Sequence, residues 1–314
     1  MKEVFCIGEL LIDFVAEKQG NNLSEAKEFT KKAGGAPANV ACAIARLGGK
    51  SSFMGCVGND PFGNFLLNVL EEEGVNISLA QRSEEFTTLA FVSIDEDGER
   101  DFVFSRGADK EFKYSPSIKN MFYNNMVHFG AATALLGGNL EEAYGRFLFD
   151  AITHDAFVSF DPNYRADLWK NKEHIFIKKC MPFIEKSTLC KFSLEEAKLL
   201  SNKEDILDAC AFFHEMGTKV VTVTMGAEGT LLSSHKKAEI VPSIPVKAVD
   251  TTGAGDAFIG CFLQQISGLK ETNELIADFD LLVKMVAKAN KAGAITTQNY
   301  GAIRSLPTQD QLNT

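Results

Sequence analysis

Residues 248–266 read AVDTTGAGDAFIGCFLQQI, with Gly253, Ala254 and Gly255 directly before an apolar, helix-like stretch that opens at Asp256. The start of a helix carries unpaired backbone N–H groups and a partial positive charge, so it is a natural site for an anion. Glycines before the helix let a phosphate reach these amides without meeting a Cβ. We therefore predict an anion hole at residues 253–255, in front of a helix that begins at Asp256.

Asp256 needs a separate explanation, because a carboxylate beside a phosphate repels it. The same side chain can act as a base that removes a proton from a hydroxyl group attacking the phosphate. The alternative is that Asp256 only stabilises the helix start through the helix dipole, a contribution of about 0.3–1 kcal/mol. That alternative leaves the three small residues unexplained, so the sequence favours the base.

The composition is that of an ordinary soluble globular protein. The 314 residues suffice for one large α/β unit or for two domains, and 45% of them are hydrophobic and 24% charged. The formal net charge of −10 argues against a nucleic-acid or anionic-membrane binder, because no basic stripe would neutralise phosphates. An anionic ligand would have to be met locally, by helix ends, a metal ion or a few arginines.

The 7 cysteines are scattered without a C-x-x-C pair, and the 5 histidines are isolated. This pattern favours reduced, buried thiols in a cytoplasmic protein over a disulfide framework or a zinc site. Residues 1–14 are apolar but contain Glu9 and Asp13 and lack a small-residue cleavage site, so they predict a first core strand and not a signal peptide. No apolar run approaches the ~20 residues that span a bilayer, so no membrane association is expected.

Short β-rich runs alternate with helix-like stretches along the chain. The β-rich runs are 4–10, 51–58, 126–132, 156–162, 188–193 and 219–226, and the helix-like stretches include 139–153 and 205–216. Such alternation predicts an α/β fold in which helices cover both faces of a mainly parallel sheet. Ligands of such sheets gather beyond the carboxyl ends of the strands.

Residues 87–112 break this alternation. They are typical of a hairpin, with alternating strands on either side of a turn at Asp95–Gly98 and no helix nearby to cover them. We predict a small antiparallel β lid, in which the polar stretch Asp13–Lys32 pairs with the hairpin. The predicted lid comprises 13–33 and 87–113, and the predicted core 1–12, 34–86 and 114–314. Exposed strand edges favour pairing with another copy of the chain, so a homodimer through the lid is expected.

A second glycine-rich helix start lies at residues 34–49, GGAPANVACAIARLGG. Pro37 suits the first turn of a helix, and Asn39 in the same turn faces whatever approaches the helix start. We interpret Gly34–Gly35 as a hinge between lid and core and Asn39 as a ligand-binding residue; a glycine-rich helix entry without a ligand is the alternative. The following GGKSS is not a P-loop, because Ile44 replaces the leading glycine and the loop ends a helix. The first strand is not followed by G-x-G-x-x-G, which disfavours a nicotinamide dehydrogenase.

Three stretches together resemble the PfkB (ribokinase-like) family of sugar kinases. They are residues 250–258 (DTTGAGDAF), 34–49, and 55–63 (GCVGNDPFG), and they match both signature regions of the family in its order and spacing. The resemblance covers essentially the whole chain. It implies a three-layer α/β/α ribokinase-like core with a small antiparallel β lid.

By this resemblance Asp256 is the catalytic base. The backbone amides of Gly253, Ala254 and Gly255 would hold the transferred phosphoryl group, and Arg165 resembles the family arginine whose planar fork reaches the phosphates.

A monovalent cation, such as K⁺, is also implied by the resemblance. Asp250 and Thr252, with the loop Thr296–Ser305, match the region where many members hold it, mostly through backbone oxygens.

The resemblance also implies where the sugar binds. Asp13 and Asn39 fall where the family grips sugar hydroxyls, and carboxylates and amides suit the paired hydrogen bonds of a polyol. The implied substrate-binding residues are Asp13, Gly34, Gly35, Asn39, Arg106, Asn163 and Asp256. For Arg106, in the predicted lid, a solvated arginine on a hairpin is the alternative.

Residues 191–200 (KFSLEEAKLL) resemble a family segment that usually contains N-x-x-E, whose glutamate organises Mg²⁺ through water. Glu196 matches this glutamate, whereas Ser193 stands where asparagine is common and caps the helix in the alternative interpretation. The implied ATP-binding residues are Lys191, Ser193, Thr224, Gly226, Gly229, Gly253, Gly255 and Asn290. Of these, Asn290 is expected near the adenine.

Within the family, residues 8–14, 34–63 and 160–169 are most similar to the fructokinases. The resemblance therefore implies an enzyme that uses ATP and Mg²⁺ to convert D-fructose to fructose 6-phosphate. A ribokinase, a 2-keto-3-deoxygluconate kinase or an aminoimidazole riboside kinase would share both signature regions. A catalytically inactive sugar sensor is the alternative outside the enzymes, and the presence of Asp256, Gly253 and Gly255 disfavours it.

Overall fold

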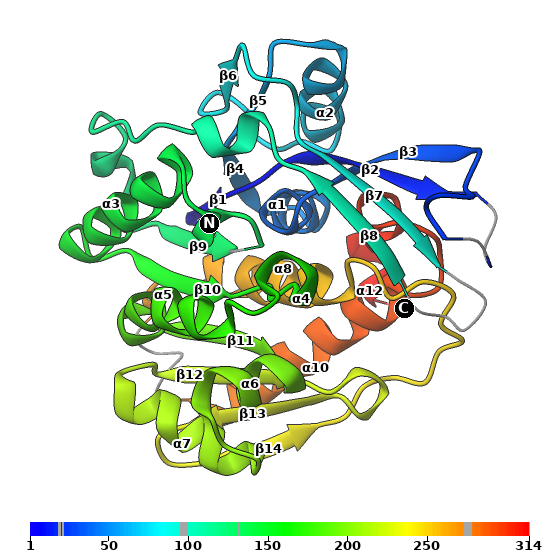
Figure 1. Ribbon diagram of the computed structural model, residues 1–314. Helices are drawn as coiled ribbons and strands as arrows, with labels where there is room; N and C mark the ends of the chain where they lie inside the picture. The colour runs from blue at the N-terminus through cyan, green and yellow to red at the C-terminus, as the bar shows by residue number, and fades with distance from the viewer. Residues whose placement is uncertain (18–19, 21, 95–99, 131, 273–277, 314) are drawn as a thin grey trace.

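The structure is a computed structural model that describes residues 1–17, 20, 22–94, 100–130, 132–272 and 278–313 (Figure 1). Within these residues the central sheet has eight strands, in the order β14-β13-β12-β11-β10-β9-β1-β4. The strands are β1 Glu3–Ile7, β4 Lys50–Met54, β9 Met126–Gly130, β10 Phe157–Asp161, β11 Leu189–Ser193, β12 Val220–Thr224, β13 Thr230–Ser234 and β14 Ala238–Val241. In this sheet order, the adjacent strands from β12 through β11, β10, β9 and β1 to β4 all pair in parallel. At the other edge, β13 pairs antiparallel with β12, and β14 pairs antiparallel with β13. The mainly parallel sheet is confirmed, whereas the two antiparallel edge strands were not predicted.

Helices cover both faces of this sheet, as predicted. Successive side chains of β1 point to opposite faces, so Val4 and Cys6 pack in one hydrophobic core and Phe5 and Ile7 in another. The first core includes side chains of α1 Ala36–Arg46, α8 Ala254–Ser267 and α10 Phe279–Thr296. The second includes side chains of α3 Asn139–Thr153, α5 Glu173–Lys186, α6 Leu194–Ser201 and α7 Ile206–Met216. The three-layer α/β/α core is confirmed.

Further elements complete the part of the chain that the structure describes. They are α2 Pro61–Glu72, α4 Ala166–Trp169, α11 Ala302–Ser305 and α12 Gln309–Asn313, the strand pair β5 Cys56–Gly58 and β6 Gln81–Ser83, and 3₁₀ turns at Ala108–Glu111, Lys119–Phe122, Ala134–Leu136 and Gly226–Glu228. Across the described ranges, no helix combines the length and the apolar character needed to cross a membrane.

A second, smaller sheet forms the lid. Its strands are β2 Leu11–Ala16, β3 Phe29–Gly34, β7 Leu89–Ile94 and β8 Arg100–Ser105, in the order β3-β2-β7-β8. Both β2–β3 and β7–β8 are antiparallel pairs, and the two pairs meet in one parallel pairing between β2 and β7. The small sheet is confirmed, and its one parallel junction was not predicted. The predicted turn at Asp95–Gly98 lies outside the described residues.

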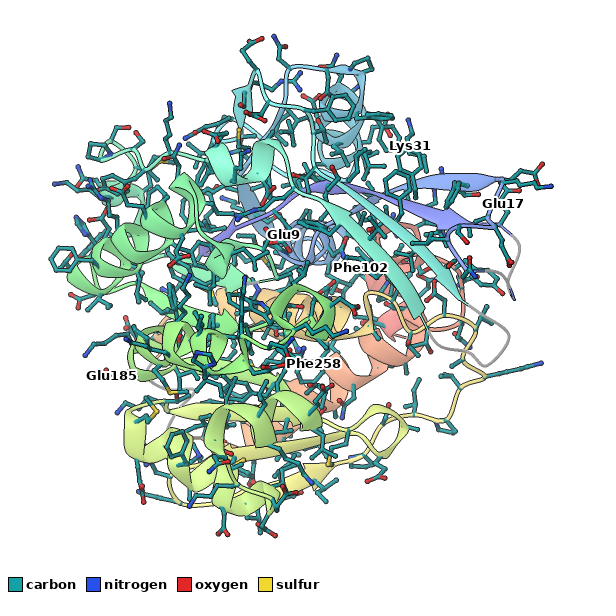
Figure 2. The ribbon with its side chains drawn as sticks, viewed as in Figure 1. Glu9, Glu17, Lys31, Phe102, Glu185 and Phe258 are labelled. Carbon is teal, nitrogen blue, oxygen red and sulfur yellow. The ribbon has the colours of Figure 1, made fainter. Side chains whose placement is uncertain are left out.

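The expectation that no helix covers the lid is wrong. Helix α2 lies against the face of β2 that carries Phe14, and the ring of Phe62 meets the ring of Phe14 edge-on at 5.8 Å between centroids. Phe14 also stacks on Phe91 of β7 at 5.1 Å. The physical reason is strand alternation, which gives the lid an aromatic face that needs a partner. The opposite face carries Asp13, Phe102 and Phe104, which line a cavity between the lid and the core, and Figure 2 shows Phe102 on this side of the lid.

Candidate active site

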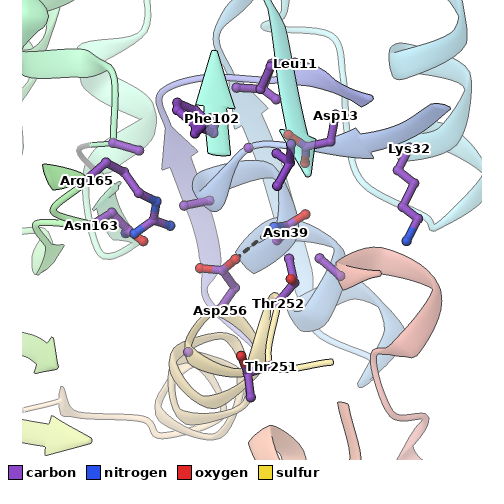
Figure 3. A pocket seen from close by; sticks show the side chains of 18 of the residues that line it. Leu11, Asp13, Lys32, Asn39, Phe102, Asn163, Arg165, Thr251, Thr252 and Asp256 are labelled. Atoms are coloured by element: carbon purple, nitrogen blue, oxygen red, sulfur yellow. Dashed lines mark hydrogen bonds between the residues drawn. The ribbon is translucent and has the colours of Figure 1, made fainter. Parts of the chain in front are cut away.

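A cavity of about 600 Å³ lies between the inner face of the lid and the core. Its lining comes from all four lid strands, the starts of α1 and α8, the segments after β10 and β11, and the loop at residues 300–302. Figure 3 shows Asp13 and Asn39 on one side of this space, Arg165 and Asn163 on another, and Asp256 at its floor. Residues from distant parts of the sequence therefore meet here.

The predicted anion hole is the amino end of α8. Gly253 is the capping residue, with φ +80°, a conformation that glycine adopts without strain. A Cβ on Gly253 would lie 2.7 Å from Cβ of Ala302, and one on Gly255 would lie 3.0 Å from Nζ of Lys191. The helix begins at Ala254, two residues earlier than predicted, because the left-handed turn at Gly253 already directs the chain into it.

Asp256 lies in the first turn of α8, and its side chain faces the cavity. It is 8% exposed, and its Oδ2 accepts a hydrogen bond of 2.8 Å from Nδ2 of Asn39 (Figure 3). The other amide atom, Oδ1 of Asn39, is buried and has no protein partner among the described residues. Asn39 is thus oriented by Asp256 and presents a free acceptor to a ligand.

Burial raises the pKa of Asp256, because desolvation disfavours the charged carboxylate. The hydrogen bond from Asn39 and the positive charges of Lys191 and Arg165 oppose this rise in pKa without cancelling it. A carboxylate with a raised pKa accepts a proton more readily, which suits a general base.

Lys191 and Asp161 form a buried ion pair beside Asp256, with Nζ 3.0 Å from Oδ2. Burial alone would lower the pKa of Lys191, but the charges of Asp161 and Glu196 outweigh burial and raise it. Burial raises the pKa of Asp161, against the opposing positive charge of Lys191. The ammonium of Lys191 therefore lies next to Gly255 with its charge retained.

Glu196 and Ser193 form a capping box at the start of α6. Ser193 accepts from the backbone N–H of Glu196, and Glu196 Oε2 accepts from the backbone N–H of Ser193 at 2.7 Å. Glu196 Oε1 accepts from the backbone N–H of Tyr164, also at 2.7 Å. Ser193 thus caps the helix. Glu196 lines the cavity with both oxygens oriented and with lone pairs left for water around a metal ion.

Asp250 ties the segment before α8 to the C-terminal loop. Its Oδ1 accepts from the N–H of Thr252 and its Oδ2 from the N–H of Gly301, both at 2.9 Å. Burial alone would raise the pKa of Asp250, but these hydrogen bonds outweigh burial and lower it. The backbone N–H groups of Val249 and Asp250 also donate to the carbonyl oxygen of Thr297. The carboxylate thus holds two backbone segments together, and the resemblance implies that a cation here would be held mostly by backbone oxygens.

Asp13 and Gly35 line the end of the cavity where the resemblance implies the sugar, and Gly34 adjoins Asp13. A Cβ on Gly34 would overlap the carboxylate of Asp13, and one on Gly35, at φ +115°, would overlap the carbonyl group of Glu9. Close packing therefore requires both glycines, whatever their role in lid movement. Burial raises the pKa of Asp13 to about 6, against the opposing charges of Arg165 and Lys32.

Asn163 and Arg165 enter the cavity from the loop after β10. Asn163 adopts φ +48° and is 5% exposed, and its Nδ2 donates to the carbonyl oxygen of Asp161 at 3.3 Å. Arg165 is exposed, and its Nη1 donates to the carbonyl oxygen of Tyr164 at 3.0 Å. Its guanidinium group faces Asp256 across the cavity (Figure 3).

Six of the predicted site residues do not line this cavity: Gly34, Arg106, Gly226, Gly229, Ala254 and Asn290. Arg106 instead pairs with Asp109, with Nε 3.0 Å from Oδ2. Asn290 accepts from Oγ1 of Thr230 at 2.6 Å and donates to the carbonyl oxygen of Val241 at 2.8 Å, which ties α10 to β13 and β14. Thr224 does line the cavity. The assignments of Gly34 and Arg106 to the sugar, of Ala254 to the phosphoryl group, and of Gly226, Gly229 and Asn290 to ATP stay predictions.

A buried polar cluster near the crossings between lid and core was missed by the sequence analysis. Glu9 accepts from the N–H of Ala36 at 3.2 Å and from the N–H of Thr133 at 3.4 Å. Thr133 Oγ1 also donates to Oδ2 of Asp109 at 2.9 Å, and Asp109 Oδ1 accepts from the hydroxyl of Thr88. Burial raises the pKa of Glu9 to about 7. The only signal in the sequence was Glu9 itself, a carboxylate inside an apolar first strand region.

Comparison with known proteins identifies the family. The model of the pfkB family carbohydrate kinases matches residues 1–309. This chain belongs to the pfkB family. The resemblance recognised from residues 34–63 and 250–258 is therefore confirmed, and as a pfkB kinase the chain is a sugar phosphotransferase.

Named relatives of this pfkB kinase are fructokinases. A probable fructokinase-5 of Arabidopsis thaliana is 36% identical over 97% of this chain and 94% of its own length. The crystal structure of a fructokinase with bound ATP from Xylella fastidiosa matches with a TM-score of 0.88 and 30% identity, over 99% of this chain and 97% of that one. A fructokinase double mutant from Vibrio cholerae, with fructose, ADP and potassium ion bound, matches with a TM-score of 0.86 and 29% identity, over 100% and 97%.

Proposed function

We propose that the chain is a fructokinase, which transfers the γ-phosphoryl group of ATP to O6 of D-fructose. The observation that carries this proposal is the placement of Asp256 on the cavity floor, beside a helix start capped by Gly253 at φ +80°. Proton acceptor and anion-binding amides thus lie within one helical turn of each other. The fructokinase relatives support fructose as the sugar.

In the proposed reaction, fructose lies between the lid and the core, held by Asp13, Asn39 and Asn163. O6 attacks the γ-phosphorus, its proton passes to the Asp256 carboxylate, and the bond from phosphorus to the bridging oxygen breaks to leave ADP. The amides of residues 253–255 and the guanidinium of Arg165 stabilise the charge on the phosphoryl oxygens. The lid excludes water, which would otherwise compete as the nucleophile.

The residues around the anion hole fit a metal-bound nucleotide. Mg²⁺ carried with ATP supplies further charge neutralisation at the phosphate oxygens. Glu196 is the residue that would bind the water molecules around Mg²⁺. Each of its carboxylate oxygens accepts one backbone N–H and keeps a further lone pair for such a water. The segment that includes Asp250 and Thr252, joined to Thr297 and Gly301, would hold K⁺, and the potassium ion of the Vibrio cholerae relative supports this assignment.

The proposal extends to assembly and location. Val103 of the lid is 52% exposed, Phe86 just before the lid strand β7 is 53% exposed, and we propose that two copies pair through this sheet. The seven cysteines are all free and buried, which supports a reducing compartment such as the cytoplasm.

The experiment that tests the function follows ADP release from ATP with D-fructose, D-ribose, 2-keto-3-deoxygluconate and aminoimidazole riboside. We expect the highest kcat/KM with fructose, and fructose 6-phosphate, identified by ¹³C NMR, as the product. A kcat/KM at least tenfold higher with another of these substrates would reassign the sugar. Absence of any sugar-dependent ADP release would favour the inactive sensor.

A further inference from the structure

Cationic groups are scarce in the cavity. Among the described lining residues the cationic side chains are those of Lys32, Arg165 and Lys191. The carboxylates that line the same cavity are more numerous: Glu9, Asp13, Asp167, Glu195, Glu196, Asp250 and Asp256. A site that must accept the charge of ATP therefore depends on each cation, and Lys191 is already paired with Asp161.

Lys32 is the lid residue among these cations. It lies on β3 directly opposite Asp13 of β2 in the antiparallel pairing, so both side chains point to the inner face of the lid. Lys31, its neighbour, points the other way, with Nζ 3.7 Å from the ring centroid of Phe65 on α2 (Figure 2). Two adjacent lysines of one strand thus face opposite environments, the cavity and the covered outer face.

The ammonium of Lys32 lies over the loop that backs the anion hole. Its Nζ is 5.8 Å from the ring centroid of Tyr300 and 3.5 Å from the position that a Cβ on Gly301 would occupy. The same loop contacts the anion hole directly, because Ala302 packs against Gly253.

The charge of Lys32 is not neutralised by an ion pair within the described part of the chain. The positive charge of Lys32 opposes the rise in the pKa of Asp13 and contributes to the lowered pKa of Asp250. Its electrostatic field therefore reaches both of these carboxylates, at the two ends of the cavity. Figure 3 shows Lys32 and Arg165 on opposite sides of Asp256 and Thr252. The two cations that have no carboxylate partner therefore flank the place where a phosphoryl group would lie.

We propose that Lys32 is a phosphate-binding residue of the lid, which contacts the transferred phosphoryl group opposite Arg165. The inference rests on the proposed function and adds a residue to its machinery. An ammonium on a flexible four-carbon stem can follow the phosphoryl group from ATP to the sugar without a change in its own protonation. Because this ammonium belongs to the lid, closure of the lid would depend on the phosphoryl group as well as on the sugar.

The test measures binding of D-fructose and of D-fructose 6-phosphate by titration calorimetry to wild type, Lys32→Met, Lys32→Arg and Lys31→Met. We expect Lys32→Met to weaken fructose 6-phosphate binding about 10- to 100-fold, the scale of a charged hydrogen bond, and fructose binding less than about threefold. In turnover, kcat should fall while KM for fructose stays nearly constant. Lys32→Arg should restore part of the loss, and Lys31→Met should change neither ligand.

Each other outcome overturns a different claim. Equal weakening of both ligands in Lys32→Met would make Lys32 a sugar-binding residue and leave the fructokinase assignment intact. Unchanged binding of both ligands would remove Lys32 from the site. If wild type binds neither fructose nor fructose 6-phosphate, the fructokinase assignment itself fails, and the inference fails with it. Thermal unfolding of each variant confirms that the comparison is made between folded proteins.

Discussion

The side chains of Asn39 and Asp256, 217 residues apart in sequence, meet in a hydrogen bond of 2.8 Å. They are brought together because α1 and α8 pack closely, with the Cβ position of Gly260 only 3.1 Å from the carbonyl oxygen of Val40. A larger residue at 260 would push the two helix starts apart. In the proposed reaction this contact would join the sugar side of the cavity to the phosphoryl side, so that Asn39 would bind the sugar and also orient the base Asp256.

The first prediction concerns Asp256 as the base. Asp256→Asn keeps the shape of the side chain and the neighbourhood of Asn39 but cannot accept the proton, so kcat should fall by roughly 10²–10⁴. The dissociation constant for fructose should change less than about threefold. Steady-state kinetics and calorimetry measure the two quantities. Asp167→Asn, which alters an exposed carboxylate at the rim of the same cavity, is the matched control, and near-normal turnover in Asp256→Asn would refute the assignment.

The second prediction concerns pH and the sugar site. Burial raises the pKa of Asp13 to about 6, so its carboxylate is ionised above this pH and protonated below it. The ionised form accepts hydrogen bonds from sugar hydroxyls with both oxygens. KM for fructose should therefore be constant from pH 7 to 8 and rise below pH 6, by up to about tenfold per unit. Asp13→Asn should bind fructose more weakly and show no such inflection, whereas a wild-type KM that is flat down to pH 5 would contradict the role of Asp13.

The third prediction concerns the glycine cap of the anion hole. Gly253→Ala places a Cβ 2.7 Å from that of Ala302 and requires a non-glycine residue at φ +80°, a strain of about 1–2 kcal/mol. The amides should shift away from the phosphoryl position, with a loss of kcat/KM for ATP of at least about tenfold. Gly145→Ala is the control: it lies in α3, where a Cβ meets nothing within 4 Å, and should stabilise the fold slightly. Equal kinetics in the two variants would argue against the anion hole.

The fourth prediction decides between two roles for Arg106. Because Arg106 pairs with the fully buried Asp109, Arg106→Met should lower the free energy of unfolding by about 1–3 kcal/mol in urea denaturation. Arg146→Met removes an exposed arginine paired with Glu142 on α3 and should cost less than about 0.5 kcal/mol. A raised KM for fructose with unchanged stability would instead place Arg106 on the sugar.

Short-range patterns predicted much of this molecule. The bounds of α3 coincide with the predicted stretch at residues 139–153, and the predicted strand runs contain β9, β10, β11 and β12 within one or two residues. These predictions succeeded because the alternation of β-rich and helix-like stretches and the capping of helices depend on residues close together in sequence. Asp205, for example, caps α7 with its own side chain. The strands β13 and β14 were missed because their pairing at the sheet edge depends on β12 and not on a pattern of their own.

The sequence by itself determined the local arrangement at residues 253–256, because a glycine at a left-handed turn, the amides of a helix start and an adjacent carboxylate all lie within a few residues of one another. Only the tertiary structure decided which side chains face them. The cross-strand pairing of Lys32 with Asp13 and the capture of Arg106 by Asp109 follow from strand register and burial, which join segments far apart in the chain. Register and burial depend on how the lid packs on the core, and no local stretch of sequence records that packing.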